Sequence, residues 1–314
     1  MNKYLIFRTD RVGDFLLTSI LINSIKRNDP YSHISIVASE KNYNYIKTFT
    51  NINEIFLLKN KFTNKLKCIL KLRKNFYDVI IIHDEKNRSL FISRLCKYKK
   101  RIIIKKSLVT THINKIKKIL LDLNFNFKEQ DLDILKNRNN QNIKIKEKFA
   151  LLHFDEKWIF YEYIKEYTNI EPSEYQLEKF INSIYSKLNI RLIITTGINT
   201  SQKLNNVIEN INNSNISLFS NLKFIDLENI VLQANLIIAC HGAISHIGSA
   251  NNIKQIDIIE YKKLEFYKLW TDHFRNHIFL YRKNFDELSN DIIKLLWTFL
   301  KKSIIINTLN NPIH

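Results

Sequence analysis

Short runs of β-branched and aromatic residues alternate with longer, partly polar segments along the whole chain. Strands are predicted at residues 4–8, 33–38, 54–58, 78–83 and 101–105. Between them, residues 14–28 and 86–97 carry apolar side chains at i, i+3 and i+4, which predicts amphipathic helices. Near-continuous apolar strands separated by such helices are typical of a parallel sheet covered on both faces. The first half is therefore predicted to be a doubly wound α/β domain.

The same pattern restarts after a polar stretch at 136–148, KNRNNQNIKIKEK, which buries little surface and predicts a linker. Further strands are predicted at 149–153, 191–196, 216–219, 236–240 and 255–259, with helices near 173–188, 200–212, 227–234, 244–251 and 285–303. We therefore expect an N-terminal α/β domain at 1–140 and a C-terminal one at 149–314. The last helix is expected to pack back toward the N-terminal domain.

The composition favours a cytoplasmic globular protein. The length of 314 residues suggests about two domains, because single cores stop growing near ~250 residues. Cys68, Cys96 and Cys240 are odd in number and have no metal-like spacing, which indicates thiols in a reducing compartment. The first apolar run is too short for a signal sequence, and no segment reaches the about 18 apolar residues of a membrane span.

The charge balance is strongly basic. Lysine and arginine total 49 against 30 acids, a formal net charge of +19. Such an excess favours polyanionic partners, which include nucleic acid, anionic lipid headgroups and phosphorylated substrates. A biased codon supply explains a chain rich in Lys, Asn and Ile equally well, so the charge alone does not choose a partner.

The four glycines, Gly13, Gly197, Gly242 and Gly248, lie at or just past predicted strand ends or on the helices that follow. Glycine permits positive φ and close backbone approach to a ligand, and a helix N-terminus offers N–H groups to a phosphate. These positions therefore fit phosphate-binding turns, although tight turns need glycine for structural reasons alone. No loop has the G-x-G-x-x-G or Walker A pattern, so dinucleotide binding and P-loop ATP hydrolysis lose their usual support.

Two stretches, LIFRTDRVGDFLLTSILINSIKRNDP near the start and ANLIIACHGAISHIGSANN at 234–252, resemble glycosyltransferase family 9. Residues 77–95 and 149–158 support the resemblance, and the four matches are in order and cover most of the chain. The family comprises the heptosyltransferases of bacterial lipopolysaccharide core synthesis and their relatives. The resemblance implies an α/β GT-B fold, in which two Rossmann-like, doubly wound parallel-sheet domains face a central cleft.

The resemblance implies that Asp14 is the general base of an inverting sugar transfer, since the family's catalytic acid follows the glycine matched by Gly13. A carboxylate there takes the proton of the acceptor hydroxyl while the anomeric carbon is attacked opposite the leaving nucleotide. Gly13 would let the turn place the carboxylate in the cleft. Taken alone, an aspartate at a helix start is more typical of a helix cap.

The resemblance also implies a donor site in the second domain. The family binds the donor's diphosphate with backbone N–H groups after a D-[ST]-G-x-x-H pattern and with a lysine, which needs no metal. The expected donor-binding residues are Lys157, Thr195, Thr196, Gly197, Ile225, His241, Gly242, Ala243, Ile244 and His246. A nucleotide sugar is then the substrate, and neither a cofactor nor a metal is expected.

The chain departs from the family pattern at three of these positions. His241 replaces an acid that touches the donor sugar, Gly242 replaces Ser or Thr, and Ala243 replaces the glycine. The change at His241 puts ADP-heptose in question as the donor, and the sugar, the nucleotide base and the acceptor stay open. Lys157 fits an exposed lysine beside Trp158 as a simpler alternative, and His246 equally fits a structural histidine.

The expected function is therefore metal-independent, inverting transfer of heptose or another sugar to a lipopolysaccharide-core, lipooligosaccharide-core or other surface-glycan acceptor in the cytoplasm. A phosphorylated or lipid-linked acceptor, and peripheral contact of residues 97–106 and 113–120 with the anionic inner membrane, would give the basic charge a use. A lysine-guarded edge strand and a solvated helix explain those two stretches equally well.

Two other functions fit parts of the sequence. The net charge and 14 tyrosines suit a nucleic-acid-binding protein, but the basic residues are scattered and no binding motif is present. A nucleotide-sugar epimerase of the same fold needs carboxylates and histidines that converge on the sugar, and His153, His241 and His246 keep it open.

Overall fold

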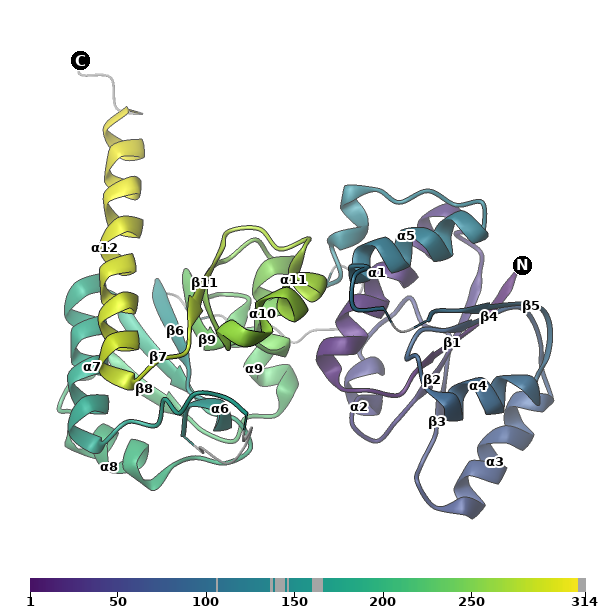
Figure 1. Cartoon of the computed structure of the whole chain (residues 1–314), viewed down its shortest axis with the longest axis horizontal. Coiled ribbons are helices and arrows are strands. Elements are labelled where there is room, and N and C mark those ends of the chain that lie inside the picture. The colour runs from purple at the N-terminus through teal and green to yellow at the C-terminus, as the bar shows by residue number, and fades with distance from the viewer. Residues whose placement is uncertain (106, 136–137, 139–144, 146, 160–165, 310–314) are drawn as a thin grey trace. The chain divides into compact units, whose positions relative to one another are not determined.

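The structure, a computed structural model, describes residues 1–105, 107–135, 138, 145, 147–159 and 166–309, with side chains up to residue 297. It forms two compact units, Met1–Gln141 with Glu265–Phe274, and Asn142–Leu264 with Arg275–His314. Each unit is a parallel β-sheet with helices on both faces, as Figure 1 shows. Most of the predicted linker at 136–148 lies outside the described residues. The predicted α/β class with two parallel sheets is confirmed.

The first unit contains a five-stranded sheet in the order β3-β2-β1-β4-β5. Its strands are β1 Lys3–Arg8, β2 His33–Ala38, β3 Glu54–Leu57, β4 Phe76–Ile82 and β5 Lys97–Ile103. Its helices are α1 Val12–Asn28, α2 Tyr43–Ile46, α3 Phe62–Arg73, α4 Asn87–Arg94, α5 His112–Asp122 and the short η1 Glu129–Leu132. All neighbouring strands are parallel, so their carboxyl ends lie at one edge of the sheet.

Helices cover both faces of this first sheet. On one face, Phe15 of α1 packs edge to face on Phe49, just after α2, with ring centroids 5.0 Å apart. On the other face, Cys68 of α3 and Ile92 of α4 share one core. The returning segment Glu265–Phe274 joins this unit through Trp270, whose ring lies 3.8 Å from that of His112. The result is the doubly wound arrangement in which strand ends carry functional loops.

The second unit contains a six-stranded parallel sheet in the order β11-β10-β9-β6-β7-β8. Its strands are β6 Phe149–His153, β7 Arg191–Thr195, β8 Ile216–Phe219, β9 Leu236–Cys240, β10 Lys254–Ile259 and β11 His277–Tyr281. The helical elements are α6 Glu156–Ile159, α7 Glu174–Leu188, α8 Gln202–Asn210, α9 Phe224–Val231, α10 Ala243–Ala250, η3 Tyr261–Lys263 and α12 Phe285–Leu309. Helix α11, Leu264–Thr271, follows η3 in the chain but belongs almost entirely to the first unit. Strand β11 is an edge strand that the sequence analysis did not predict.

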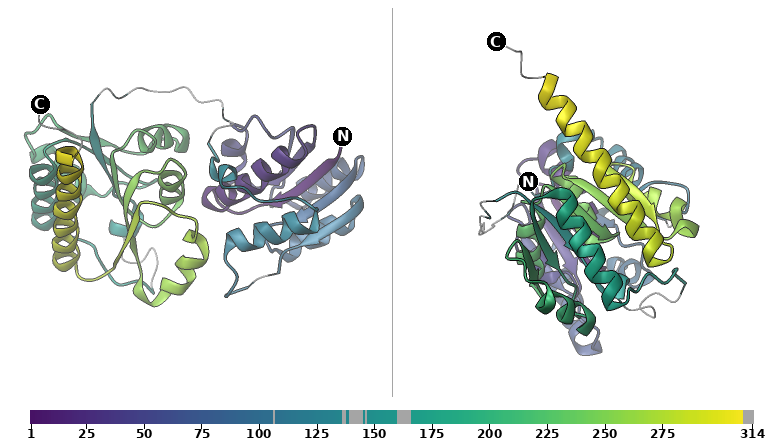
Figure 2. Two further views of the ribbon diagram at one scale, coloured as in Figure 1. Left: turned by 90° about the horizontal axis from the view of Figure 1, so that it is seen from above. Right: turned by 90° about the vertical axis from the view of Figure 1, so that its left-hand side faces the viewer.

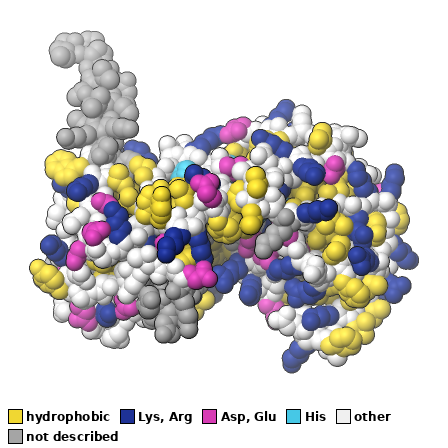
Figure 3. All heavy atoms as spheres, in the orientation of Figure 1, with side chains coloured by type: hydrophobic (Ala, Val, Ile, Leu, Met, Phe, Trp, Pro, Cys, Tyr) yellow, Lys and Arg dark blue, Asp and Glu magenta, His cyan; other side chains and the backbone are white. Residues whose placement is uncertain are grey.

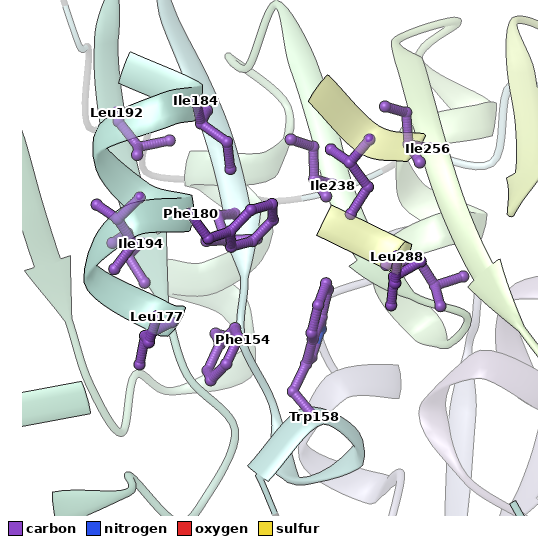
Figure 4. Packing of buried hydrophobic residues seen from close by; sticks show 14 of the residues in the cluster. Phe154, Trp158, Leu177, Phe180, Ile184, Leu192, Ile194, Ile238, Ile256 and Leu288 are labelled. Atoms are coloured by element: carbon purple, nitrogen blue, oxygen red, sulfur yellow. The ribbon is translucent and has the colours of Figure 1, made fainter. Parts of the chain in front are cut away.

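An aromatic cluster at the centre of the second unit fixes the short helix α6. Trp158 is 1% exposed and stacks on Phe154, with ring centroids 5.0 Å apart, and it also contacts Phe180 and Phe285. Figure 4 shows Trp158 among Phe154, Phe180 and Leu288. Burying a tryptophan removes a large apolar area from water, so α6 is held firmly and with it the neighbouring Lys157.

The first turns of α12 belong to this core. Leu288, like Ile292 and Leu296 further along α12, is fully buried with Phe180 of α7, and Gln176 donates a 2.8 Å hydrogen bond to Asp286. The views in Figures 1 and 2 agree that α12 runs beside α7. The predicted return of this helix toward the first domain stays a prediction. Among the helices that the structure describes, none is long and apolar enough to cross a bilayer.

The glycines do not supply positive backbone φ angles, contrary to expectation. No glycine has positive φ, whereas Asn124, Asn189 and three further asparagines do, with Asn189 at φ 49° ending α7. Asparagine tolerates the left-handed conformation because its short side chain hydrogen-bonds locally. In this asparagine-rich chain, the amide residue therefore takes the role that glycine usually has at helix ends.

Candidate functional site

Asp14 lies in the first turn of α1, which begins at Val12, two residues earlier than predicted. Its Oδ2 accepts a 3.1 Å hydrogen bond from the backbone N–H of Arg11, so the carboxylate does contribute to the helix cap. Burial nevertheless raises the pKa of Asp14, and the positive charge of Arg8 opposes the rise. A helix N-terminus by itself favours the ionised form of a carboxylate. The surroundings of Asp14 therefore increase its proton affinity, which suits a general base.

Charged side chains surround Asp14 at the carboxyl ends of β1 and β4. Arg8 donates from Nη1 to Asp10 at 3.1 Å, and Lys86 forms an ion pair with the other oxygen of Asp10. Arg8 and Lys86 lower the pKa of Asp14, whereas Asp10 raises it. None of these three residues was predicted from the sequence. Their position at or just after the ends of two adjacent parallel strands was the available signal.

Two buried nitrogens next to this group have no hydrogen-bond partner among the described residues. They are Nη2 of Arg8 and Nε2 of His83, in side chains that are 3% and 2% exposed. Thr18 joins the two residues, since its hydroxyl accepts from Arg8 Nε at 2.7 Å and lies 2.9 Å from His83 Nδ1. Burial, with a smaller contribution from Arg8, holds the pKa of His83 well below its usual range. Unsatisfied buried polar atoms are costly, and they are typical of ligand-binding positions.

Asp84 connects the ends of the two central strands beneath this group. Its Oδ2 accepts 2.6 Å hydrogen bonds from the hydroxyls of Thr9 and Ser89. The next residue, Glu85, has a φ of 53° and pairs with Lys115 at 2.6 Å. A left-handed glutamate is unusual and persists only where the surroundings hold it. The loop after β4 is therefore rigidly tied to the loop after β1.

In the second unit, Lys157 lies against the turn that begins α10. Its Nζ forms an ion pair with Asp155 and lies 3.5 Å from the carbonyl oxygen of Cys240. A Cβ atom at Gly242 would come within 3.2 Å of this Nζ, so glycine permits the close approach. The lysine and the glycine turn, predicted separately from the sequence, thus meet at the carboxyl ends of β6 and β9.

His241 rests on a buried carboxylate that the sequence analysis missed. Its Nδ1 lies 2.6 Å from Oδ2 of Asp257, and the other oxygen of Asp257 accepts a 2.6 Å hydrogen bond from the Ser245 hydroxyl. Asp257 is 1% exposed and comes from the middle of β10. A carboxylate on one ring nitrogen fixes the tautomer and orientation of an imidazole. An acid is therefore present behind His241, one strand away from its expected place.

Helix α10 begins directly after this turn. Gly242 is its N-cap residue, Ala243 and Ile244 form its first turn, and the buried His246 lies with its ring centroid 5.5 Å from that of His241. The Gly242 N–H donates to Ser245 Oγ at 3.2 Å. A helix start of this kind presents backbone N–H groups and a positive dipole end.

The predicted loop after β7 lies next to the loop after β6. Thr195 Oγ1 is 2.9 Å from Nδ1 of His153, and burial lowers the pKa of that histidine to about 4. The hydroxyl of Thr196 lies 2.9 Å from that of Thr200. Ile225 lies in the first turn of α9, after β8, three strands away from β9 in the sheet. It is thus the predicted residue furthest along the sheet from the α10 turn.

Gly197 leaves room for the carboxylate of Glu156. A Cβ atom at this position would lie 2.0 Å from Glu156 Oε2, while Glu156 Oε1 accepts a 2.8 Å hydrogen bond from Asn199 N. We therefore expect Gly197→Ala to displace the flexible glutamate and to lower the free energy of unfolding by about 1 kcal/mol, the usual worth of one hydrogen bond. Thermal unfolding monitored by circular dichroism checks this. An unchanged Tm would show that the Glu156 contact does not stabilise the loop.

Among the described residues, no group of three or more His, Cys, Asp or Glu side chains is arranged to hold a metal ion. At the carboxyl edge of each sheet, charged residues form ion pairs, such as Arg8–Asp10 in the first unit and Lys157–Asp155 in the second.

Neither a family model nor a curated protein matches the sequence, but solved structures match the fold. Heptosyltransferase WaaC of E. coli, solved with ADP, has a TM-score of 0.71 and 12% identity, covering 96% of this chain and 99% of its own. A glycosyl transferase family 9 structure from Veillonella parvula has a TM-score of 0.63 and 12% identity, covering 90% of this chain and 86% of its own. The fold is the GT-B fold of these transferases. The resemblance predicted from motifs is thus confirmed as a likeness of fold.

A nucleotide-sugar epimerase shares the fold more distantly. The UDP-GlcNAc 2-epimerase of Methanocaldococcus jannaschii has a TM-score of 0.56 and 12% identity, covering 94% of this chain and 92% of its own.

Proposed function

We propose that the protein is an inverting, metal-independent glycosyltransferase that moves a sugar from a nucleotide-sugar donor to a surface-glycan acceptor such as a lipopolysaccharide core. One observation carries the proposal: a chain with the heptosyltransferase fold holds Asp14, an acid whose pKa is raised by burial, at the carboxyl edge of its first sheet. The WaaC structure was solved with ADP, which supports a nucleotide-sugar donor.

In this reaction Asp14 takes the proton of the acceptor hydroxyl. The hydroxyl oxygen forms a bond to the anomeric carbon, and the bond from that carbon to the diphosphate breaks on the opposite side, which inverts the configuration. Burial raises the pKa of Asp14, which makes its carboxylate a stronger proton acceptor. Arg8 and Lys86, close to Asp14, suit an anionic or phosphorylated acceptor.

The second unit supplies the donor site. Lys157 places a positive charge beside the Gly242 turn, and the N–H groups of Ala243 and Ile244 lie at the start of α10. Together they would stabilise the negative charge that develops on the departing diphosphate. His241, whose Nδ1 is held by Asp257, would present Nε2 as a hydrogen-bond acceptor to a hydroxyl of the donor sugar. The proposal requires that a sugar bound at this site reaches Asp14, which the cleft implied by the family resemblance would allow.

Metal independence gives a direct prediction. Because Lys157 and the α10 amides neutralise the diphosphate, we expect turnover in excess EDTA to equal turnover in Mg²⁺. The measurement is release of nucleoside diphosphate in the presence of acceptor. Loss of activity in EDTA that Mg²⁺ restores would show that the phosphates are held by a metal.

The identity of the nucleotide-sugar donor can be determined by measuring ligand binding. A ligand that binds only the folded state raises Tm by mass action. A thermal-shift screen of ADP-, UDP-, GDP- and CDP-sugars is expected to show one nucleotide class that raises Tm. If none of the four classes shifts Tm, the proposed donor site is wrong.

Epimerisation of a nucleotide sugar is the second candidate. The fold similarity to the archaeal epimerase and the histidines at the edge of the second sheet, His153, His241 and His246, favour it. An epimerase releases an epimerised sugar nucleotide without any acceptor, whereas a transferase consumes the acceptor. Product analysis with and without acceptor therefore separates the two.

A further inference from the structure

Helix α3 carries a row of large apolar residues on the side that faces away from the protein, in addition to those that it buries. Phe62, Leu66 and Leu70 recur every four residues and are 78%, 47% and 52% exposed. Cys68 and Leu72 are buried against the sheet at 5% and 0% exposed. Residues two positions apart on a helix point about 200° apart. The exposed apolar stripe therefore lies almost opposite the buried one, on the side where an ordinary surface helix is polar.

The apolar surface continues from α3 onto α4. Phe91 on α4 is 58% exposed, and Leu95, just after it, is 37% exposed. Phe76, at the start of β4, is 54% exposed. Because α3 and α4 cover the same core, these side chains belong to one face of the first unit. Figure 3 shows hydrophobic side chains gathered over α3 and α4, with lysine and arginine around them. We call this surface the α3–α4 face.

The α3–α4 face is strongly basic as well as apolar. Residues 59–77, KNKFTNKLKCILKLRKNFY, contain seven lysines and arginines and no acid. Residues 86–95, which include α4, contain Lys86, Arg88 and Arg94 and no acid. A helix with exposed large apolar side chains and flanking lysines is typical of a segment that lies in the headgroup region of a membrane. Juxtaposed lysines and arginines bind the negative surface of anionic lipids.

A cavity beside the same helix adds cationic groups. Its volume is about 310 Å³, and it lies between α3 and the edge strand β3. Lys59, Lys67 and Lys71 line it, with Tyr43, Asn64 and a single acid, Glu54. The size and the excess of lysine suit the phosphate and polar head of one anionic lipid.

The stretches at 97–105 and 113–120 do not combine these features. Lys100 on β5 is bonded to the carbonyl oxygen of Asp122, and the Arg101 guanidinium lies 5.4 Å from the Tyr98 ring. On α5, Ile116 and Ile119 are buried, so its apolar side faces the core of the unit. These stretches form an edge strand and an ordinary amphipathic helix, and among their described residues neither carries a row of exposed apolar side chains like that of α3.

We propose that the α3–α4 face docks the protein on an anionic lipid bilayer, with Phe62, Leu66 and Leu70 inserted among the headgroups and the surrounding lysines on the lipid phosphates. This docking does not depend on the transfer reaction. It fits an acceptor that is lipid-linked, but it is measured without donor or acceptor, so its failure leaves the proposed function untouched.

The test is co-sedimentation of the full chain with vesicles of phosphatidylcholine, with or without phosphatidylglycerol. The protein is expected to bind the vesicles that contain phosphatidylglycerol, and to bind less as salt screens the charges. The triple variant Phe62→Ser, Leu66→Ser, Leu70→Ser is expected to lower the partition coefficient at least about tenfold, because each inserted side chain contributes apolar burial. An unchanged Tm shows that the variant is folded, since these side chains lie outside the core.

The control is Leu108→Ser, Val109→Ser, Leu121→Ser, which removes three side chains that are 74%, 88% and 73% exposed at and before α5. It is expected to bind vesicles as the unchanged protein does. The proposal is overturned if the unchanged protein does not bind anionic vesicles, or if the α5 control loses binding while the α3 variant keeps it. It is also overturned if light scattering shows a dimer that the α3 variant dissociates while vesicle binding is unaffected, because the face would then bind a second copy.

Discussion

Asp14→Asn is expected to lower turnover at least ~10²-fold, the usual scale for removing a general base, while donor affinity stays nearly unchanged. The asparagine oxygen still accepts the hydrogen bond that Arg11 N donates in the structure, so the start of α1 is preserved. What is lost is the proton acceptor. The measurement is steady-state release of nucleoside diphosphate at saturating donor. Turnover within tenfold of the unchanged protein would reduce Asp14 to a helix cap.

The stability of the same variant separates the two roles. Burial raises the pKa of Asp14 in the folded state, so the folded protein binds this proton more tightly than the unfolded chain does. The contribution of Asp14 to stability is therefore complete below its unfolded pKa, about 3.9, and is lost as pH rises through the folded pKa. Asp14→Asn removes this loss of stability at high pH, because the amide does not ionise. We expect its Tm at neutral pH to equal or exceed that of the unchanged protein, with no gain near pH ~3.

A pure cap gives the opposite result. There the ionised carboxylate stabilises the helix start, and its replacement by a neutral amide lowers Tm at neutral pH. The pH profile of kcat/KM gives a third readout. If Asp14 is the base, the acid limb lies above the ordinary aspartate pKa, because burial raises it.

Lys157→Ala is expected to weaken nucleoside diphosphate binding about tenfold or more, because a charge-assisted contact to phosphate is worth roughly 1.5–3 kcal/mol. The loss has two sources. The positive charge at the Gly242 turn disappears, and the buried carboxylate of Asp155 is left without its lysine partner. Isothermal titration calorimetry with the nucleoside diphosphate found in the thermal-shift screen measures the change.

Lys203→Ala is the matched control, since Lys203 is also an ion-paired lysine of the second unit, 2.7 Å from Glu171. It is expected to leave nucleotide affinity unchanged. If Lys157→Ala also leaves it unchanged, Lys157 has no part in the donor site, and the alternative of a structural lysine held by Asp155 is correct.

The architecture could be predicted from the periodicity of apolar residues because the strands are buried on both faces. The run LIIAC at Leu236–Cys240 is fully buried, and the pattern placed it correctly. Strand His277–Tyr281 was not predicted, although its sequence HIFLY is as apolar as that of the predicted strands; it is partly buried at the edge of its sheet.

The site could be predicted only where one short segment carries it. Asp14 and the HGAISH turn are local motifs, whereas Asp257 reaches His241 from another strand through the fold. No spacing in the sequence indicates that contact. The expectation of positive φ at the glycines was wrong, since the described residues with positive φ are Glu85 and five asparagines at other positions. Gly197 and Gly242 instead allow close approach of Glu156 and Lys157.

The most direct test of the central claim is the anomeric configuration of the product, determined by NMR after reaction of the donor identified by thermal shift with a lipopolysaccharide-core acceptor. We predict that the sugar is joined to the acceptor with a configuration opposite to that in the donor, that one nucleoside diphosphate is released for each sugar transferred, and that Asp14→Asn almost abolishes both. A product of retained configuration, or an epimerised sugar nucleotide formed without acceptor, would contradict the proposed role of Asp14.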